Sequence, residues 1–168
     1  MKIFITSDTH FFHGNVIKYA DRPFKDINHM NQVLVDNWND VVSIEDCVLH
    51  LGDFAFSGKT AYQRVTSALN GRIYLVKGNH DYSKRQIGEY FANVLSTFVW
   101  NKRVFSHKPV REDFWKHNPE VLFNYHGHMH NKCMDDKRYI NCSVEVNDYK
   151  PFLLTVEDGY DLLQIIQK

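Results

Sequence analysis

Residues 73–81 have the sequence Ile73-Tyr74-Leu75-Val76-Lys77-Gly78-Asn79-His80-Asp81. A short apolar run of β-branched and aromatic residues is typical of a strand buried in a sheet. This run ends in a lysine, a glycine and three further polar side chains. Ordinary turns also use Gly, Asn and Asp, but a turn does not explain the histidine between them. The stretch therefore predicts a buried strand whose carboxyl end carries a polar site.

Two earlier segments have the same arrangement. Lys2–Thr6 is an apolar, β-rich run that stops at Ser7-Asp8-Thr9-His10, and Cys47–Leu51 is followed by Gly52-Asp53. Continuous apolar strands of this kind are typical of sheets that are covered on both faces. We therefore expect these runs to lie beside residues 73–76 in one sheet.

Helical periodicity separates these strands. From about Asn28, with Asp26 as a plausible cap, apolar residues recur at steps of three and four; they are Met30, Val33, Leu34, Trp38 and Val41. A second helix is expected from about Thr60 to Leu69, closed by Asn70-Gly71. The alternation of buried strands and helices indicates an α/β sheet with right-handed crossovers.

The second half of the chain is richer in strands. Val94–Trp100 and Arg103–Ser106 are expected to form a hairpin through Asn101-Lys102. The other expected elements are strands at Val121–Tyr125 and Arg138–Val146, a turn at Asp135-Asp136, and a final helix from a capping box at Thr155 and Asp158 to near Gln167. We predict one domain over residues 1–168, a layered α/β/β/α sandwich of two mixed sheets flanked by helices, with a metal site at the carboxyl ends of the strands.

Composition supports a packed domain without a strong charge preference. Of the 168 residues, 43% are hydrophobic and 14% aromatic, and 20 basic residues balance 20 acidic ones. No global field would therefore attract nucleic acid or an anionic membrane, although bound metal ions would add local positive charge. Three cysteines give no disulfide framework, and neither a signal peptide nor a transmembrane stretch is recognisable, so we expect a cytoplasmic protein.

Residues of the types that bind metals follow the predicted strands. The candidates are Asp8, His10, Asp53, Asn79, His107, His128 and His130. Because the carboxyl ends of strands meet at one edge of an open α/β sheet, we expect a single polar centre. Seven candidates exceed the four ligands of a closed zinc site but suit two ions that share a carboxylate. Carboxylate, imidazole and amide donors without cysteine favour manganese, with iron, zinc, nickel or cobalt as alternatives.

Glycine precedes Asp53, Asn79 and His128, where we expect it to allow a tight turn and to leave room for an ion and a substrate. Each fragment alone has a simpler interpretation, such as a turn or an exposed imidazole. Ten histidines is an unusual number, and we expect His29 and His117 to be exposed and inert. The ordered combination of fragments, rather than any one of them, indicates the site.

The order of these fragments resembles the calcineurin-like metallophosphoesterase superfamily. The matching blocks are Asp8-x-His10, Gly52-Asp53, Gly78-Asn79-His80-Asp81, a lone His107 and Gly127-His128-x-His130. They span residues 8–130, most of the chain. The resemblance implies a metal-dependent phosphoric ester hydrolase with two divalent ions.

The resemblance also implies a role for each residue. One ion would be held by Asp8, His10 and His130, the second by Asn79, His107 and His128, and both by a bridging Asp53. His80 would not be a ligand but would lie beside the scissile phosphate, protonating the leaving group or stabilising charge. Our hypothesis for the reaction is an in-line attack by a metal-bridging hydroxide on phosphorus, without a phosphoenzyme.

Two further segments refine the resemblance. Residues 7–15 and Arg22-Pro23-Phe24 are similar to a compact subgroup found in bacteria and their phages. In such a protein His13 and Asn15 would lie close to the metals and contact substrate, although a hydrogen-bonded loop start explains them equally well. Asp81 is expected to support its loop rather than to perform chemistry.

Departures from the family pattern narrow the range of substrates that we expect. The sequence Gly52-Asp53-Phe54-Ala55-Phe56 lacks the aspartate and arginine that follow this block in protein serine/threonine phosphatases, which argues against phosphoprotein substrates. Only Pro109–Glu120 is available as a short lid. The side chains of Lys108, Arg111, Trp115 and Lys116 would meet an anion or a base there, or simply belong to a solvated loop.

We expect a phosphodiester or phosphomonoester of a nucleotide or another small molecule as substrate. A small nuclease that acts on single-stranded or terminal nucleic acid is one alternative, because base stacking would need aromatic residues among basic ones near the site. A catalytically weak metal-binding scaffold of the same fold is another. The presence of His80, which a scaffold would not need, disfavours the scaffold.

Overall fold

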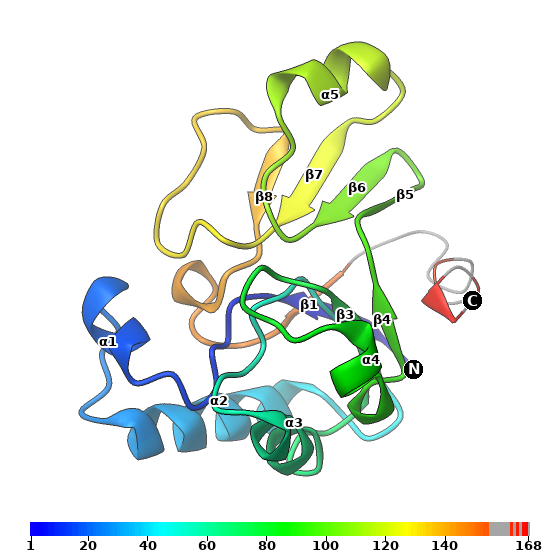
Figure 1. Ribbon diagram of the computed structural model, residues 1–168. Helices are drawn as coiled ribbons and strands as arrows, with labels where there is room; N and C mark the ends of the chain where they lie inside the picture. The colour runs from blue at the N-terminus through cyan, green and yellow to red at the C-terminus, as the bar shows by residue number, and fades with distance from the viewer. Residues whose placement is uncertain (155–161, 163, 165, 168) are drawn as a thin grey trace.

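The computed structural model describes residues 1–154, 162, 164, 166 and 167. Two sheets face each other, with helices on their outer sides (Figure 1). The first sheet has the order β4 (Asn93–Leu95), β3 (Arg72–Val76), β2 (Cys47–His50), β1 (Ile3–Thr6) and β9 (Phe152–Leu153). The second has the order β5 (Phe98–Trp100), β6 (Arg103–Ser106), β7 (Phe123–His126) and β8 (Tyr139–Asn141).

Both sheets are mixed, as predicted. In the first, β1 to β4 are parallel and β9 is antiparallel to β1. In the second, β6, β7 and β8 are parallel and β5 is antiparallel to β6. The parallel strands of each sheet therefore end at a common edge, where the loops that follow β1, β2, β3, β6 and β7 can meet.

The central strands β1, β2 and β3 are largely apolar because both faces of the first sheet are buried there. Phe4, Val48 and Leu75 point toward the helices, whereas Ile5, Leu49 and Tyr74 point into the core between the sheets. The second sheet contributes Trp100 and Phe105 to the same inner core. Because successive side chains of a strand point to opposite faces, one apolar run contributes to the hydrophobic layers on both faces of the sheet.

The predicted long helix is confirmed. It is α2 (Ile27–Val41), whose buried face consists of Met30, Leu34 and Trp38, and it begins where Asp26 accepts a hydrogen bond of 2.8 Å from the backbone N–H of His29. The second predicted helix, α3 (Lys59–Thr66), ends three residues earlier than expected. Both helices cover the outer face of the first sheet (Figure 1).

The expected strand Val94–Trp100 is wrong as a single element. Its first part is β4, which pairs in parallel with β3, and its second part is β5, which pairs with β6 in the other sheet. Both parts contain β-forming apolar residues, so the hydrophobic pattern alone could not show that the chain changes sheets between them. The β5–β6 hairpin itself is confirmed, and its turn residues Asn101 and Lys102 have the positive φ angles of 43° and 60° that such tight turns require.

Two later strand predictions had wrong boundaries. β7 begins at Phe123, two residues after the expected start. In the range expected to form a strand from Arg138 to Val146, only Tyr139–Asn141 is a strand, and Val144–Val146 is the 3₁₀-helix η2. The side chain of Asn141 accepts a hydrogen bond from the backbone N–H of Ser143, a local contact that competes with sheet pairing.

Several short helices were not predicted, because three to six residues carry too little periodicity. They are α1 (Asn15–Tyr19), α4 (Lys84–Ile87), η1 (Gly88–Tyr90) and α5 (Glu112–His117). The first of these lies at the edge of the molecule near the loops that follow the strands (Figure 1).

The segment considered as a lid, Pro109–Glu120, packs as part of the outer layer. Trp115 on α5 is buried against Val104 and Val121, and its indole N–H donates a hydrogen bond of 2.8 Å to the hydroxyl of Tyr139. Lys108, Arg111 and Lys116 are exposed. With α5 on the outer face of the second sheet, the α/β/β/α sandwich is confirmed, and Trp115 is not available to stack on a base.

The capping box expected at Thr155 and Asp158 lies outside the described residues. Farther along, Leu162 and Ile166 are buried in the core between the sheets. Among the residues that the structure describes, no helix has both the length and the apolar character needed to cross a membrane.

Candidate metal centre

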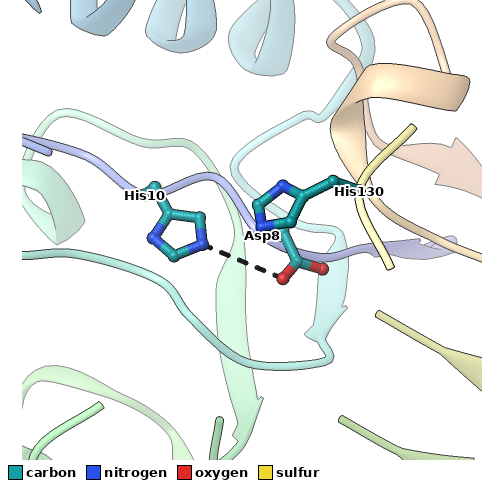
Figure 2. A group of neighbouring side chains, drawn as sticks. All are labelled: Asp8, His10 and His130. Carbon is teal, nitrogen blue, oxygen red and sulfur yellow. Dashed lines mark ion pairs between the residues drawn. The ribbon is translucent and has the colours of Figure 1, made fainter. Parts of the chain in front are cut away.

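The first group of metal-binding side chains lies where β1 and β7 end. Asp8, His10 and His130 each offer a ligand atom, and these atoms lie within 4.8 Å of one another. Figure 2 shows the imidazole rings of His10 and His130 beside the carboxylate of Asp8. The two rings are stacked, with centroids 5.2 Å apart. Residues separated by 120 positions in the chain thus form one compact site.

A second group lies beside the first. Asp53, His107 and His128 also offer ligand atoms within 4.8 Å of one another. The side-chain oxygen of Asn79 is 3.0 Å from Nε2 of His107, so the amide joins the same group. The structure therefore brings all seven predicted ligands together, and their role as ligands remains a prediction.

Asp53 lies between the two groups. Its Oδ2 is 3.6 Å from Nε2 of His10 in the first group and 3.4 Å from Nε2 of His107 in the second. Its Oδ1 accepts a hydrogen bond of 2.9 Å from the backbone N–H of His80. One oxygen therefore faces both groups while the other is fixed to the loop after β3. This is the position that a bridging carboxylate requires.

The backbone at these residues is unusual. Five of them have left-handed φ angles between 50° and 68°, namely Asp8, His10, Asp53, His128 and His130. Such a conformation costs about 1–3 kcal/mol for a residue other than glycine and persists only where the surrounding structure imposes it. The presence of five such residues among the candidate ligands agrees with a functional centre.

The glycines before the candidate ligands allow close packing of the loops. A Cβ atom on Gly127 would overlap the side chains of Ser7 and Asp8, and one on Gly78 would overlap Asp53. We expected these glycines to leave room for an ion and a substrate. Instead, the space that they leave is filled by the neighbouring loop and by ligand side chains.

Replacing Gly127 with alanine should therefore damage the first group. The new methyl group would displace the Asp8 carboxylate, and we expect metal affinity to fall by at least about tenfold, as when a ligand loses its supporting contacts. Calorimetric titration with Mn²⁺ measures this. Gly14→Ala is the matched control, because a Cβ there meets Ile27 at 3.7 Å, an ordinary contact. Equal affinities in the two variants would contradict the prediction.

Hydrogen bonds fix the orientation of two imidazoles. Nδ1 of His107 donates to the carbonyl of Leu51 at 2.9 Å, which directs Nε2 toward Asp53. Nδ1 of His130 lies 2.7 Å from Oε1 of Glu145, which leaves its Nε2 free for the first group. Metal-binding histidines commonly have such a partner on the second nitrogen, because it selects the tautomer and raises ligand basicity.

Sequence reasoning missed the ion pair that supports the first group. The buried guanidinium of Arg22 donates to Oε1 of Glu145 at 2.6 and 2.9 Å and to the carbonyls of Asp8 and Thr9 at 2.6 and 2.9 Å. Glu145 in turn holds His130. The pair joins residues 123 positions apart, and no local pattern around Glu145 signals it.

Arg22→Met should lower the free energy of unfolding by about 3 kcal/mol or more, because it leaves the buried carboxylate of Glu145 without its main partner. Urea denaturation of the metal-free protein measures this loss. The matched control is Lys150→Met, which removes an exposed ion pair of 2.8 Å with Asp40 and should cost less than about 1 kcal/mol. A loss no larger than that of the control would contradict a supporting role for Arg22.

The carboxylate of Asp81 holds two loops together, as expected. It accepts hydrogen bonds of 2.8 to 2.9 Å from the backbone N–H groups of Asp53, Phe54 and Gly78 and from the hydroxyl of Tyr62. Its oxygens are thereby engaged by the protein. Asp81 connects the loop after β2 with the loop after β3 and is not needed as a ligand.

The electrostatic state of the centre suits cation binding. Burial lowers the pKa of His10 to about 2, so its imidazole is neutral and can donate a lone pair. Burial would raise the pKa of Asp53, but its interaction with His107 holds that pKa below its usual range. Burial raises the pKa of the Asp8 carboxyl, and the nearby His107 and His130 oppose this rise. A cation beside Asp8 would favour its ionised form.

Two buried atoms of the first group lack any hydrogen-bond partner. They are Oδ1 of Asp8 and Nε2 of His10. Buried polar groups are nearly always paired, so an orphaned oxygen and an orphaned nitrogen aimed at the same space require an explanation. A divalent ion is a partner that accepts lone pairs from both. The residues present therefore fit a metal.

The other predicted site residues lie at different distances from the centre. His80 is exposed, and its ring centroid is 5.9 Å from that of His10. The ring of His13 is 5.3 Å from His10 and stacks on Phe56 at 4.4 Å. Asn15 is exposed at the start of α1, and within the described chain no hydrogen bond joins its side chain to the centre.

Comparison with known proteins finds relatives that match nearly the whole chain. An uncharacterized protein of Methanocaldococcus jannaschii, MJ1445, is 35% identical over 176 residues, which cover 99% of this chain and 92% of that protein. The crystal structure of AQ665 from Aquifex aeolicus, a protein of unknown function, superposes with a TM-score of 0.73 and 30% identity over 96% of this chain and 98% of that one.

A structure of an archaeal phosphodiesterase overlaps more weakly, with a TM-score of 0.46 and 19% identity over 84% of this chain and 82% of that one, too little to bear on the chemistry. The family model described as calcineurin-like phosphoesterase matches residues 1–166. Members of this family act with divalent metals, in keeping with the two groups of ligand side chains. The chain belongs to the calcineurin-like phosphoesterase family.

Proposed function

We propose that the protein hydrolyses phosphodiesters with two divalent ions, most readily Mn²⁺. One ion would be held by Asp8, His10 and His130, the other by Asn79, His107 and His128, and both by Asp53. The observation that carries the proposal is the position of Asp53 Oδ2, which faces an imidazole nitrogen of each group. The orphaned atoms of Asp8 and His10 support it further.

The donor set determines the chemistry that the ions would supply. Carboxylate, imidazole and amide donors suit Mn²⁺ and related ions. When bound, a pair of such ions lowers the pKa of a water molecule and neutralises charge on phosphoryl oxygens. The protein contributes the fixed positions of the ligands, which the strained backbone and the buried ion pair of Arg22 and Glu145 maintain.

His80 is suited to act on the leaving group. Its imidazole is exposed at the centre rather than buried among the ligands, and its backbone N–H is tied to Asp53. It can therefore contact a substrate held between the two groups and give a proton to the departing oxygen. The hydrogen bond from its backbone N–H to Asp53 keeps the backbone of His80 beside the metal ligands.

We infer a preference for a diester from the contacts of Arg22, the guanidinium that lies against the first group of ligands. The second negative charge of a monoester, held between the two groups, would call for a charge-assisted contact there. The guanidinium of Arg22, which reaches the backbone of Asp8 and Thr9, is already engaged by Glu145 and by these carbonyls. The single charge of a diester needs less additional positive charge. We also propose that the chain belongs to the compact subgroup of bacteria and their phages that residues 7–15 and Arg22-Pro23-Phe24 resemble.

The test compares bis(p-nitrophenyl) phosphate with p-nitrophenyl phosphate as substrates of the metal-free and the Mn²⁺-loaded protein. We expect hydrolysis only after loading, two bound ions per chain, and a higher kcat/KM for the diester. His117→Ala, which removes an exposed imidazole on α5, should change none of these values. Two bound ions without hydrolysis of either ester would favour the metal-binding scaffold instead, and a higher kcat/KM for the monoester would contradict the diester preference.

A further inference from the structure

A cavity of about 310 Å³ opens beside the metal centre. It is lined by Tyr19, His128, Met129, His130, Asn131 and Lys132. His130 belongs to the first group of ligands and His128 to the second, so the cavity borders both groups. The volume is at the lower end of the range of roughly 300–1,000 Å³ that is usual for small-molecule sites.

One wall of the cavity is aromatic. Tyr19, from the short helix α1, exposes 55% of its surface although it is a large apolar side chain. Its ring stands edge-on to His130 with centroids 5.6 Å apart, and its hydroxyl lies 3.5 Å from Nδ1 of His13. These contacts hold the ring at the cavity while much of it stays free. A planar heterocycle can stack on such a surface.

The lining of the cavity also includes a lysine. Lys132 is exposed, and within the described chain no ion pair engages it. Its backbone is fixed, because the amide of Asn141 donates to the carbonyls of His130 and Lys132 at 2.8 and 2.9 Å, and the Lys132 N–H donates to Met129 at 2.9 Å. The side chain of Lys132 therefore extends from a hydrogen-bonded turn, two residues after the candidate ligand His130.

We propose that the substrate is a nucleotide diester that carries a second, terminal phosphate, with a base on Tyr19 and the terminal phosphate at Lys132. The juxtaposition of metal ligands, an aromatic ring and a lysine around one cavity matches the three parts of such a molecule. This inference rests on the proposed phosphodiesterase activity and adds the class of substrate. It makes Tyr19 and Lys132 determinants of specificity rather than catalytic residues.

The test uses thymidine dinucleotides that differ only in a terminal phosphate. The Mn²⁺-loaded protein is given TpT, pTpT and TpTp, so that a terminal phosphate is tested at the 5′ end and at the 3′ end of the dinucleotide. We expect kcat/KM for at least one phosphorylated dinucleotide to exceed that for TpT by about tenfold, the effect of one charge-assisted contact. Lys132→Glu should abolish this ratio, whereas Lys102→Glu, the same charge change on the β5–β6 turn, should preserve it.

Stacking is tested at Tyr19 in the same assay. Tyr19→Ala should raise KM for the preferred dinucleotide about tenfold, and Tyr19→Phe, which keeps the ring, should restore most of the affinity. A binding measurement separates affinity from turnover. In calorimetry, thymidine 3′,5′-bisphosphate should bind more tightly than thymidine 3′-monophosphate, and Lys132→Glu should remove the difference.

The outcomes distinguish the two proposals. Hydrolysis of bis(p-nitrophenyl) phosphate without any preference for a terminal phosphate would leave the proposed function standing and overturn the substrate class. Equal binding of the bisphosphate and the monophosphate would overturn it too. Failure to hydrolyse any diester, combined with tight binding of the bisphosphate that Lys132→Glu abolishes, would contradict the hydrolase and support the nucleotide site.

Discussion

Asp53→Asn is expected to remove both metal ions and with them all measurable hydrolysis. The carboxylate oxygen Oδ2 faces His10 in one group and His107 in the other, so the substitution takes a negative charge from both positions at once. Loss of a mere supporting contact costs about 10–100-fold in metal affinity, and the loss of a shared ligand should exceed that range at each position. Metal analysis after dialysis, together with the diester assay, measures both effects.

The same substitution at two other aspartates tests whether this result is specific to Asp53. Asp8 belongs to the first group only, and an asparagine there can still accept the hydrogen bond from the backbone N–H of His128. Asp8→Asn should therefore empty one position and leave the second ion bound. Asp135→Asn, a substitution of an exposed residue, should change nothing. Retention of both ions in Asp53→Asn would show that this carboxylate is not shared.

The parts of this centre that the sequence predicts are those with a local signature. An apolar run that stops at a glycine and a carboxylate or imidazole marks both the buried strand and the residue at its carboxyl end. Asp53 and Asn79 are found in this way, because the parallel arrangement of β2 and β3 then brings their ends together. The alternation of strands and helices in the first half, and the cap of α2 at Asp26, are likewise predicted from residues that are close in sequence.

The parts that escape prediction depend on contacts distant in sequence. Glu145 lies in a short 3₁₀-helix, and its importance comes from Arg22 and His130, to which the surrounding sequence gives no clue. The change of sheet between β4 and β5 is hidden for a related reason, since both strands contain β-forming apolar residues whichever sheet they join. Tyr19 and Lys132 share a cavity only after β1 and β7 have ended at the same edge.

His80→Ala is expected to lower kcat for the diester by about 10²–10⁴-fold, the usual contribution of a general acid or base, with the metal content unchanged. The exposed imidazole of His80 lies outside both groups of ligands, so its removal takes away no ligand atom. Its contact with Asp53 is made by the backbone N–H, which alanine retains. Measurement of kcat and of bound Mn²⁺ in the same sample therefore separates chemistry from metal binding.

The leaving group distinguishes proton donation from simple stabilisation of charge. An alkoxide needs a proton in order to depart, whereas p-nitrophenolate is stable without one. If His80 gives a proton, His80→Ala should lose much more activity toward a dinucleotide than toward bis(p-nitrophenyl) phosphate, because only the former must expel an alkoxide. An equal loss with both substrates would indicate that the imidazole stabilises charge on the phosphoryl group. Loss of metal in parallel with activity would make His80 a ligand, and unchanged turnover would remove it from the mechanism.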